Sequence, residues 1–129
     1  MADDPGSLRT PLGRVRYLGS ARSGMRDDWF MRLTSVALVP LTIAFVWLLL
    51  SLLSKDYNGA RAELGSPAPA IIVLLFVLVG VYHMQLGMRS IIVDYVDGHA
   101  REWALVANLF FCAVLGLVCI YAVLRIGFV

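Results

Sequence analysis

Three long uncharged runs of residues alternate with shorter polar segments along the chain. Each run is rich in Leu, Val, Ile and Phe, and the runs cover residues 33–54, 64–88 and 103–124. A helix of about 20 apolar residues crosses a hydrocarbon core of roughly 30 Å, and backbone groups in lipid must find partners within their own segment. The pattern therefore predicts an all-α integral membrane protein with three transmembrane helices, at residues 30–54, 68–95 and 103–126.

The polar segments between the runs are short, which makes neighbouring helices antiparallel. The first connection, around residues 55–69, contains Asn58-Gly59 and two prolines and is predicted to form turns. The second, around residues 96–102, is shorter and contains an Asp-Gly pair. Pro40 lies inside the first run and predicts a kink there, because proline cannot donate the helical hydrogen bond.

The placement of the arginines predicts the orientation of the chain in the membrane. The first connection holds only Lys55 and Arg61, whereas six arginines precede the first run, at positions 9, 14, 16, 22, 26 and 32. The positive-inside rule then places the N-terminus in the cytoplasm, and three spans place the C-terminus in the periplasm. Residues 1–28 are expected to form a polar cytoplasmic tail, ahead of a membrane-anchor domain at residues 29–129.

The composition also indicates a membrane protein and adds no further function class. The chain has 129 residues, of which 60% are hydrophobic, whereas soluble domains have about 45–50%. A chain this short cannot bury that excess in a core of its own. Its net charge of +2 is too small to indicate a nucleic-acid partner. Cys112 and Cys119 lie in the third run without a metal-binding spacing, so they are interpreted as apolar packing residues.

The second run carries an ionisable residue, His83, near its middle. Such a residue is costly in a membrane and is a functional candidate by default. At about 100° per residue, Gly87, Gly80 and Asp94 fall within about 60° of it, on the same helix face. An imidazole beside glycines suits a flat ligand such as haem, because the glycines let a planar ring approach. The alternative is a histidine hydrogen-bonded to a neighbouring helix, with the glycines serving close helix packing.

If a haem is held by two histidines, the second has to come from another chain. The other histidine, His99, falls in the short second connection, about 24 Å along the helix direction from His83 if the helical rise is kept. It cannot face His83 across a haem. A subunit interface is then expected beside the second helix.

Two polar residues, Asp94 and Tyr95, end the second helix where it is predicted to reach the cytoplasmic surface. A carboxyl and a phenol there can hydrogen-bond the carbonyl oxygens of a quinone and pass protons to it. Alternatively, they are a solvated acid and an interfacial aromatic. Arg89 in the second helix and Arg32 at the start of the first can each pair with an acid or a haem propionate, or extend to the headgroups.

Two separate sets of residues are shared with a known family. In the second helix they are His83, Gly87-Met88 and Asp94-Tyr95-Val96. Ahead of the first helix and within it they are Gly19–Gly24, Trp29, Arg32–Thr34 and Ala37–Leu41. Together they resemble the smaller membrane-anchor subunit of succinate dehydrogenase (complex II), in its α-proteobacterial and mitochondrial form, from about Gly19 to the C-terminus.

The resemblance implies a hydrophobic anchor of succinate:ubiquinone oxidoreductase in the bacterial inner membrane, without activity alone. It implies one b-type haem shared with a second membrane-anchor subunit, and further partners in an iron–sulfur subunit and a flavoprotein. His83 matches the ligand to the haem metal, and Arg32 matches a basic residue near the haem propionates. Tyr95 matches the tyrosine that hydrogen-bonds ubiquinone, with Asp94 as its neighbouring acid, and Gly87 lies on the cofactor side.

The chain also departs from the family pattern ahead of the first helix. Members often carry His-Trp-Trp and Gln-Arg there, whereas this chain has Asp27-Asp28-Trp29 and Met31-Arg32, so the roles of that histidine and glutamine are not transferred. Two other functions stay open: a non-haem structural scaffold or assembly protein, and a transporter subunit with a proton relay. The few polar residues in the first and third runs count against a relay through this chain alone.

Overall fold

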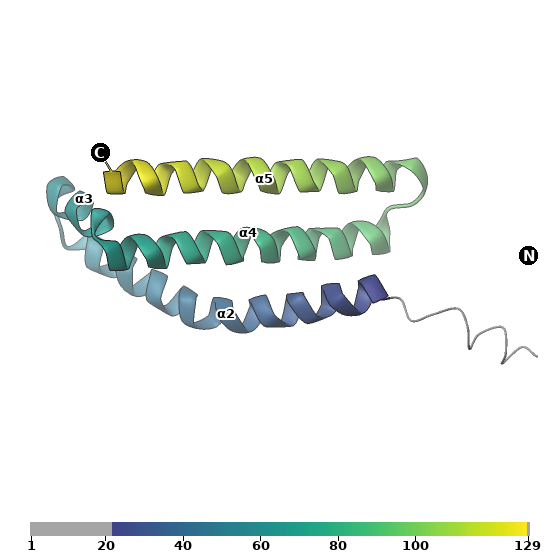
Figure 1. The fold of residues 1–129 in the computed structure, drawn as a ribbon, viewed down its shortest axis with the longest axis horizontal. Coiled ribbons are helices and arrows are strands. Elements are labelled where there is room, and N and C mark those ends of the chain that lie inside the picture. The colour runs from purple at the N-terminus through teal and green to yellow at the C-terminus, as the bar shows by residue number, and fades with distance from the viewer. Residues whose placement is uncertain (1–21, 129) are drawn as a thin grey trace, which may run out of the picture.

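The structure is a computed structural model that describes residues 22–128. Its elements, in chain order, are α2 (Arg22–Leu53), α3 (Tyr57–Gly65), α4 (Pro67–Tyr95) and α5 (Gly98–Phe128). The three long helices lie side by side and antiparallel, with α4 between α2 and α5 (Figure 1). In the described part of the chain, α2 and α5 both pack against α4, and no Cα atom of α2 lies within 8 Å of one in α5. The predicted all-α fold with antiparallel neighbours is confirmed.

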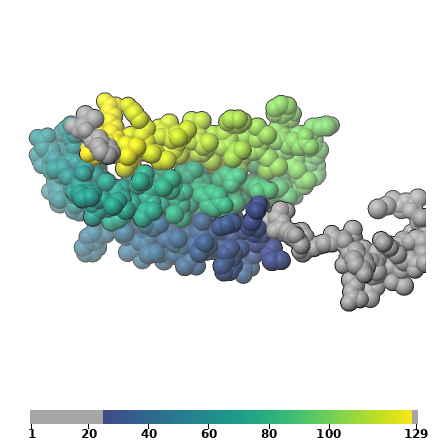
Figure 2. All heavy atoms as spheres, viewed as in Figure 1, coloured from purple at the N-terminus to yellow at the C-terminus, as the bar shows by residue number. Residues whose placement is uncertain are grey.

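Each long helix contains a stretch that is long and apolar enough to cross a membrane. The three stretches are Met25–Leu53, Pro67–Tyr95 and Gly98–Gly127, and only 6% of the most apolar window of each is buried within the chain. Figure 2 shows the side chains of the three helices stacked as one layer, with those of α4 filling the space between α2 and α5. A single layer leaves most apolar side chains facing outward, towards lipid or towards other chains.

The ends of the helices differ from the predicted ones. α2 begins at Arg22, well before residue 30, while residues 1–21 of the predicted tail lie outside the described part of the chain. α5 begins at Gly98, so the predicted second connection shrinks to two residues and His99 lies in the first turn of a helix. Gly98 has φ +64°, a conformation that glycine adopts without the steric cost of a Cβ, and this permits the abrupt turn.

The prediction of turns in the first connection is wrong for its central part. Residues Tyr57–Gly65 form the short helix α3 and include the Asn-Gly pair. Asp56 caps this helix, because its carboxylate accepts a hydrogen bond from the Gly59 N–H at 3.1 Å. Pro67 then starts α4, at a helical position where a missing N–H costs nothing.

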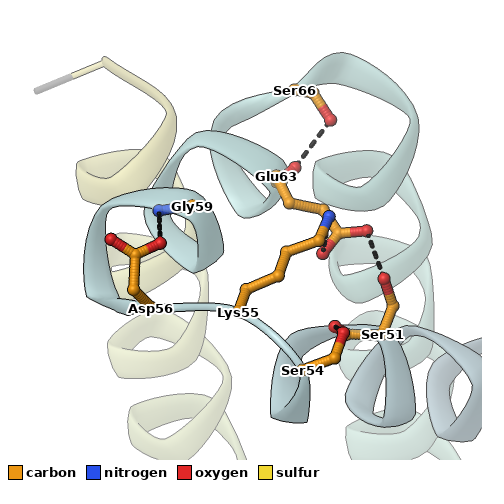
Figure 3. A network of polar contacts seen from close by, with 7 residues as sticks. All are labelled: Ser51, Ser54, Lys55, Asp56, Gly59, Glu63 and Ser66. Carbon is orange, nitrogen blue, oxygen red and sulfur yellow. Dashed lines mark hydrogen bonds and ion pairs between the residues drawn. The ribbon is translucent and has the colours of Figure 1, made fainter.

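A polar network ties α3 to the end of α2 (Figure 3). Glu63 lies at its centre, where one carboxylate oxygen accepts a hydrogen bond from Ser51 at 2.8 Å and the other pairs with Lys55 at 3.0 Å. Ser66 donates to the backbone carbonyl of Glu63 at 2.6 Å. The hydrogen bonds from Lys55 and Ser51 lower the pKa of Glu63 below its ordinary value.

Specific contacts set the positions of α2 and α5 on α4. Asn108 of α5 is buried and donates from Nδ2 to the backbone carbonyl of Gln85 in α4 at 3.1 Å. On the other side, Phe45 of α2 stacks on Phe76 of α4 with ring centroids 4.4 Å apart. Such interhelical hydrogen bonds and packed rings replace the hydrophobic driving force that is absent between helices in lipid.

Other expectations within the helices agree with the structure. α2 contains Pro40 and is bent along its length (Figure 1), as the kink prediction requires. Cys112 and Cys119 are both free, and Cys112 is buried where α5 meets α4. The burial of Cys112 agrees with a packing role, and its thiol donates to the amide oxygen of Asn108 at 3.5 Å, whereas Cys119 is half-buried.

Candidate functional site

His83 lies on the face of α4 that contacts α2. Its Nδ1 is 2.9 Å from the hydroxyl oxygen of Thr34, a residue of α2 that is buried. The same hydroxyl is also within hydrogen-bond distance of two carbonyl oxygens of its own helix, those of Phe30 at 2.8 Å and Met31 at 3.0 Å. One nitrogen of the imidazole is therefore held by the neighbouring helix.

The other nitrogen of His83 has a different environment. Within residues 22–128, Nε2 makes no hydrogen bond, and it is not among the buried polar atoms that lack a partner. His83 as a whole is half-buried, so Nε2 is free of hydrogen bonds and is not fully enclosed by this chain. An imidazole held at one nitrogen and open at the other meets the geometric requirement of a metal ligand.

The two glycines near His83 lie at the contact between α2 and α4. A Cβ added at Gly87 would be 3.8 Å from the terminal methyl group of Met31, and one at Gly80 would be 4.0 Å from Leu38. Both are ordinary van der Waals distances. The glycines are therefore covered by side chains of α2, and a small side chain would also fit at each position. This placement agrees with the helix-packing interpretation of the glycines.

A pocket of about 330 Å³ lies between α2 and α4, at the end where α2 begins and α4 ends, which we call the amino end. It is lined by acidic, basic and apolar side chains, namely Asp27, Asp28, Met31, Leu86, Arg89, Ser90, Val93 and Asp94. An ion pair crosses from one helix to the other there, with Arg89 Nη1 2.9 Å from Asp27 Oδ2. The pocket thus combines one predicted quinone-site residue, Asp94, with charged groups from both helices.

The structure does not bring Tyr95 into this pocket. Tyr95 is the last residue of α4, and it is 83% exposed. Since successive helical residues differ in direction by about 100°, Asp94 and Tyr95 open onto different sides of the helix end. The two predicted quinone-site residues are neighbours at the amino end, but this chain alone does not form one concave site around both.

Arg32 lies in α2 close to the same end. Its guanidinium pairs with Asp28, one turn earlier, at 3.0 Å, and both side chains are largely exposed. For Arg32 and Arg89 the sequence left open an acidic partner, a haem propionate or the headgroups. The four-residue spacing of Asp28 and Arg32 was a usable signal, whereas the pair between Asp27 and Arg89 depends on how two helices pack.

The side chains that could ligate a metal suit a haem better than a bare metal ion. Within residues 22–128, no cluster of three or more His, Cys, Asp or Glu side chains is arranged to hold a metal ion. A bare ion takes several protein ligands, whereas haem iron receives four nitrogens from its own ring and needs only axial ligands. A single imidazole with one nitrogen free of hydrogen bonds could supply one protein ligand to a haem iron, with any other protein ligand coming from elsewhere.

Comparison with known proteins gives a consistent result over almost the whole chain. Residues 6–123 match the family described as succinate dehydrogenase/fumarate reductase transmembrane subunit. A succinate dehydrogenase hydrophobic membrane anchor subunit of Paracoccus denitrificans is 34% identical over 118 residues, which is 92% of each chain. The protein of the same description from Rickettsia conorii is 29% identical over 109 residues, covering 83% of this chain and 86% of that one.

Proposed function

The chain belongs to the family of succinate dehydrogenase/fumarate reductase transmembrane subunits, and it is a multi-pass membrane protein. We therefore propose that it is the smaller anchor of a succinate:ubiquinone oxidoreductase. It shares a b-type haem with a second anchor subunit, and it contributes residues to the site where ubiquinone is reduced. The family resemblance seen in the sequence is confirmed by the comparisons, whereas the haem and the quinone site are the proposal.

The observation that carries the haem assignment is the environment of His83. Its Nδ1 is bound to Thr34 and its Nε2 is open, in the middle part of a membrane-spanning helix. Nε2 would hold the iron, and a bound haem would supply a one-electron carrier close to the quinone. If a second histidine holds the iron, it would come from the second anchor, since the other histidine of this chain, His99, lies beyond the α4–α5 turn.

Residues at the amino end of the layer suit quinone chemistry. The phenol of Tyr95 is exposed and can donate a hydrogen bond to a quinone carbonyl oxygen. The carboxyl of Asp94 is exposed and lines a pocket with other charged groups, so it can pass protons towards the helix end. Because Tyr95 opens away from this pocket, the rest of the quinone site would come from partner subunits.

The amino end also carries the proposed contacts with cofactor and soluble subunits. The pair between Arg32 and Asp28 is exposed, and such pairs contribute only about 0–1 kcal/mol. Arg32 can therefore exchange Asp28 for a haem propionate at little cost. The positive-inside rule places this end in the cytoplasm of a bacterial inner membrane, where the iron–sulfur subunit and the flavoprotein would dock.

The second anchor subunit would cover part of the open helix layer. Only six residues are buried among those described, namely Thr34, Leu48, Leu86, Asn108, Cys112 and Gly116. Transmembrane helices associate through packing and interhelical hydrogen bonds, and both need a facing helix. A layer of three helices with an open imidazole offers such a surface.

A second candidate function is a non-haem structural membrane scaffold or assembly protein. The hydrogen bond between His83 and Thr34 and the packed glycines would then serve helix packing alone. The two functions differ in one observable, because only the first gives the complex a b-type haem absorbance that depends on His83.

The test is a reduced-minus-oxidised optical spectrum of the detergent-solubilised complex, purified through a tag on this chain, beside the same preparation with His83→Ala. A haem band that is lost or shifted in the variant, together with succinate–ubiquinone activity in the parent, supports the proposal. A colourless parent that still reduces ubiquinone keeps the anchor function and removes the haem. A colourless parent without soluble subunits favours the scaffold.

A further inference from the structure

Thr34 is a polar residue that is buried inside a membrane-spanning helix. Its exposed fraction is 8%, and it belongs to the stretch of α2 that is apolar enough to cross a membrane. Its hydroxyl has three close neighbours: the carbonyl oxygens of Phe30 and Met31 and the Nδ1 of His83. A buried hydroxyl placed between a backbone carbonyl and an imidazole determines where hydrogens can lie.

The hydrogen positions follow from which groups can donate. The Thr34 hydroxyl has one hydrogen, and the two carbonyl oxygens can only accept. If that hydrogen were directed to His83, the hydroxyl lone pairs would face carbonyl oxygens at 2.8 and 3.0 Å without a hydrogen between them. The favourable arrangement has the hydroxyl donating to a carbonyl of its own helix and accepting the Nδ1–H of His83.

This arrangement leaves the other imidazole nitrogen without a hydrogen. A neutral imidazole carries one N–H, so placing it on Nδ1 leaves a lone pair on Nε2. Nε2 is the nitrogen that makes no hydrogen bond within residues 22–128 and is not fully enclosed by them. The hydrogen-bond chain from imidazole to hydroxyl to carbonyl also polarises the ring, which makes the free nitrogen a stronger electron donor.

We propose that Thr34 is a positioning residue for the haem ligand. It holds His83 in the tautomer with hydrogen on Nδ1, keeps the ring plane fixed against α2, and raises the electron donation of Nε2 to iron. This inference rests on the proposed function, because it needs a haem at His83. The inference assigns a role to a residue of another helix, 49 positions away in the sequence, which forms a hydrogen bond with the ligating histidine.

The variant that tests the inference is Thr34→Val, which keeps the branched shape and removes the hydroxyl. The Nδ1–H then lacks an acceptor in apolar surroundings, which costs free energy. The ring can lower this cost by turning or by changing its tautomer. Loss of such a partner of a ligating histidine lowers metal affinity by about 10- to 100-fold. We expect faster haem loss, a higher haem midpoint potential, and a changed ferric electron paramagnetic resonance spectrum in the purified complex.

Two further variants separate a role in the ligand from a role in helix packing. Thr34→Ser keeps a hydroxyl at the same place and should restore the potential and the spectrum of the parent. Ser35→Ala is the matched control, because Ser35 also donates to the Met31 carbonyl, at 2.8 Å, but its side chain is exposed and does not contact His83. That variant should behave as the parent does in every haem measurement.

The outcomes distinguish this inference from the proposed function. A parent complex whose haem band is lost in His83→Ala, with Thr34→Val altered and Thr34→Ser restored, supports both. If the haem band depends on His83 but Thr34→Val retains the parent's haem affinity, potential and resonance spectrum, the positioning role is overturned and the proposed function stands. A parent without haem overturns the positioning role and the haem assignment together, whereas the anchor function stands if that parent still reduces ubiquinone.

Discussion

The ion pair between Asp27 and Arg89 joins the start of α2 to the end of α4, and its geometry sets how strongly it should hold them together. The two charged atoms are 2.9 Å apart, and the side chains of Arg89 and Asp27 are 44% and 32% exposed. Replacing Asp27 with Asn removes one charge and keeps the size of the side chain, whereas replacing Arg89 with Gln removes the other charge and leaves a shorter polar side chain. The pair is the cross-helix charge contact that lines the pocket containing Asp94.

The partial burial of the pair determines the expected coupling. Unit charges about 4 Å apart attract by about 1 kcal/mol in water and by about 4 kcal/mol at the effective dielectric constant of a protein surface. Loss of hydration and of side-chain freedom offsets much of this, and exposed pairs retain about 0.2–1 kcal/mol. For a pair that is more than half shielded, we expect a coupling free energy of about 1 kcal/mol, towards the upper end of that range.

The coupling is measured by a double-mutant cycle on the free energy of unfolding in mixed micelles. Unfolding is followed by energy transfer between labels at the start of α2 and the end of α4. The control cycle uses Asp28 and Arg32, a pair within one helix whose side chains are 60% and 74% exposed. That pair should give about 0.3–0.5 kcal/mol.

Salt provides the second criterion for this ion pair. Raising the ionic strength from about 0.01 M to about 1 M shortens the Debye length from about 30 Å to about 3 Å, so the coupling should fall. A coupling of zero for Asp27 and Arg89 at low salt would contradict the expected contribution. So would a coupling that is no larger than that of the control pair or one that ignores salt.

Three further predictions concern other parts of the chain. Tyr95→Phe should leave haem and assembly intact and slow ubiquinone reduction by about 2- to 10-fold, because one hydrogen bond is lost; unchanged steady-state kinetics would remove Tyr95 from the quinone site. Asn108→Ala removes the bond to the Gln85 carbonyl and should destabilise the α4–α5 contact by about 0.6–1.7 kcal/mol in micelle unfolding; an effect below that range would assign the contact to packing alone. Because the pKa of Glu63 is lowered from 4.5, the ionised carboxylate stabilises the folded chain above that pH, and this contribution disappears as the pH falls through the lowered value. Thermal unfolding over a series of pH values should show this acid loss in the parent and not in Glu63→Gln, and identical pH profiles would contradict the Lys55–Glu63 contact as its cause.

The sequence identified candidate site residues along one helix, but it did not show which residues of the neighbouring helix contact them. His83 in the middle of α4 and the polar end at Asp94 and Tyr95 could be named, because hydropathy and helical periodicity place them along one segment. The side of α4 that faces α2 could not be named, since helix packing depends on side chains far apart in the sequence. For the same reason, the sequence did not identify Thr34 as the partner of His83 or Asp27 as the partner of Arg89.

The helix α3 forms where the strongest local signal in the sequence predicted a turn. The Asn-Gly pair at residues 58–59 predicted a turn, yet these residues are helical because Asp56 caps α3 and Glu63 anchors it to α2. A cap is worth about 1 kcal/mol, enough to outweigh the low helix propensity of a single glycine. The anchoring contact joins residues 12 positions apart on different helices, which a local pattern does not contain.

Sequence alone was enough to establish an all-α membrane protein with three antiparallel spans that resembles a succinate dehydrogenase anchor. These features follow from the length of apolar segments and from the need of every backbone group in lipid for a partner in its own helix. The packing of the helices was needed to place α4 between α2 and α5, and to show that Thr34 holds one nitrogen of His83 while the other stays open. Lipid is as apolar as the side chains themselves, so the order and rotation of the helices depend on a few hydrogen bonds and packed rings between them.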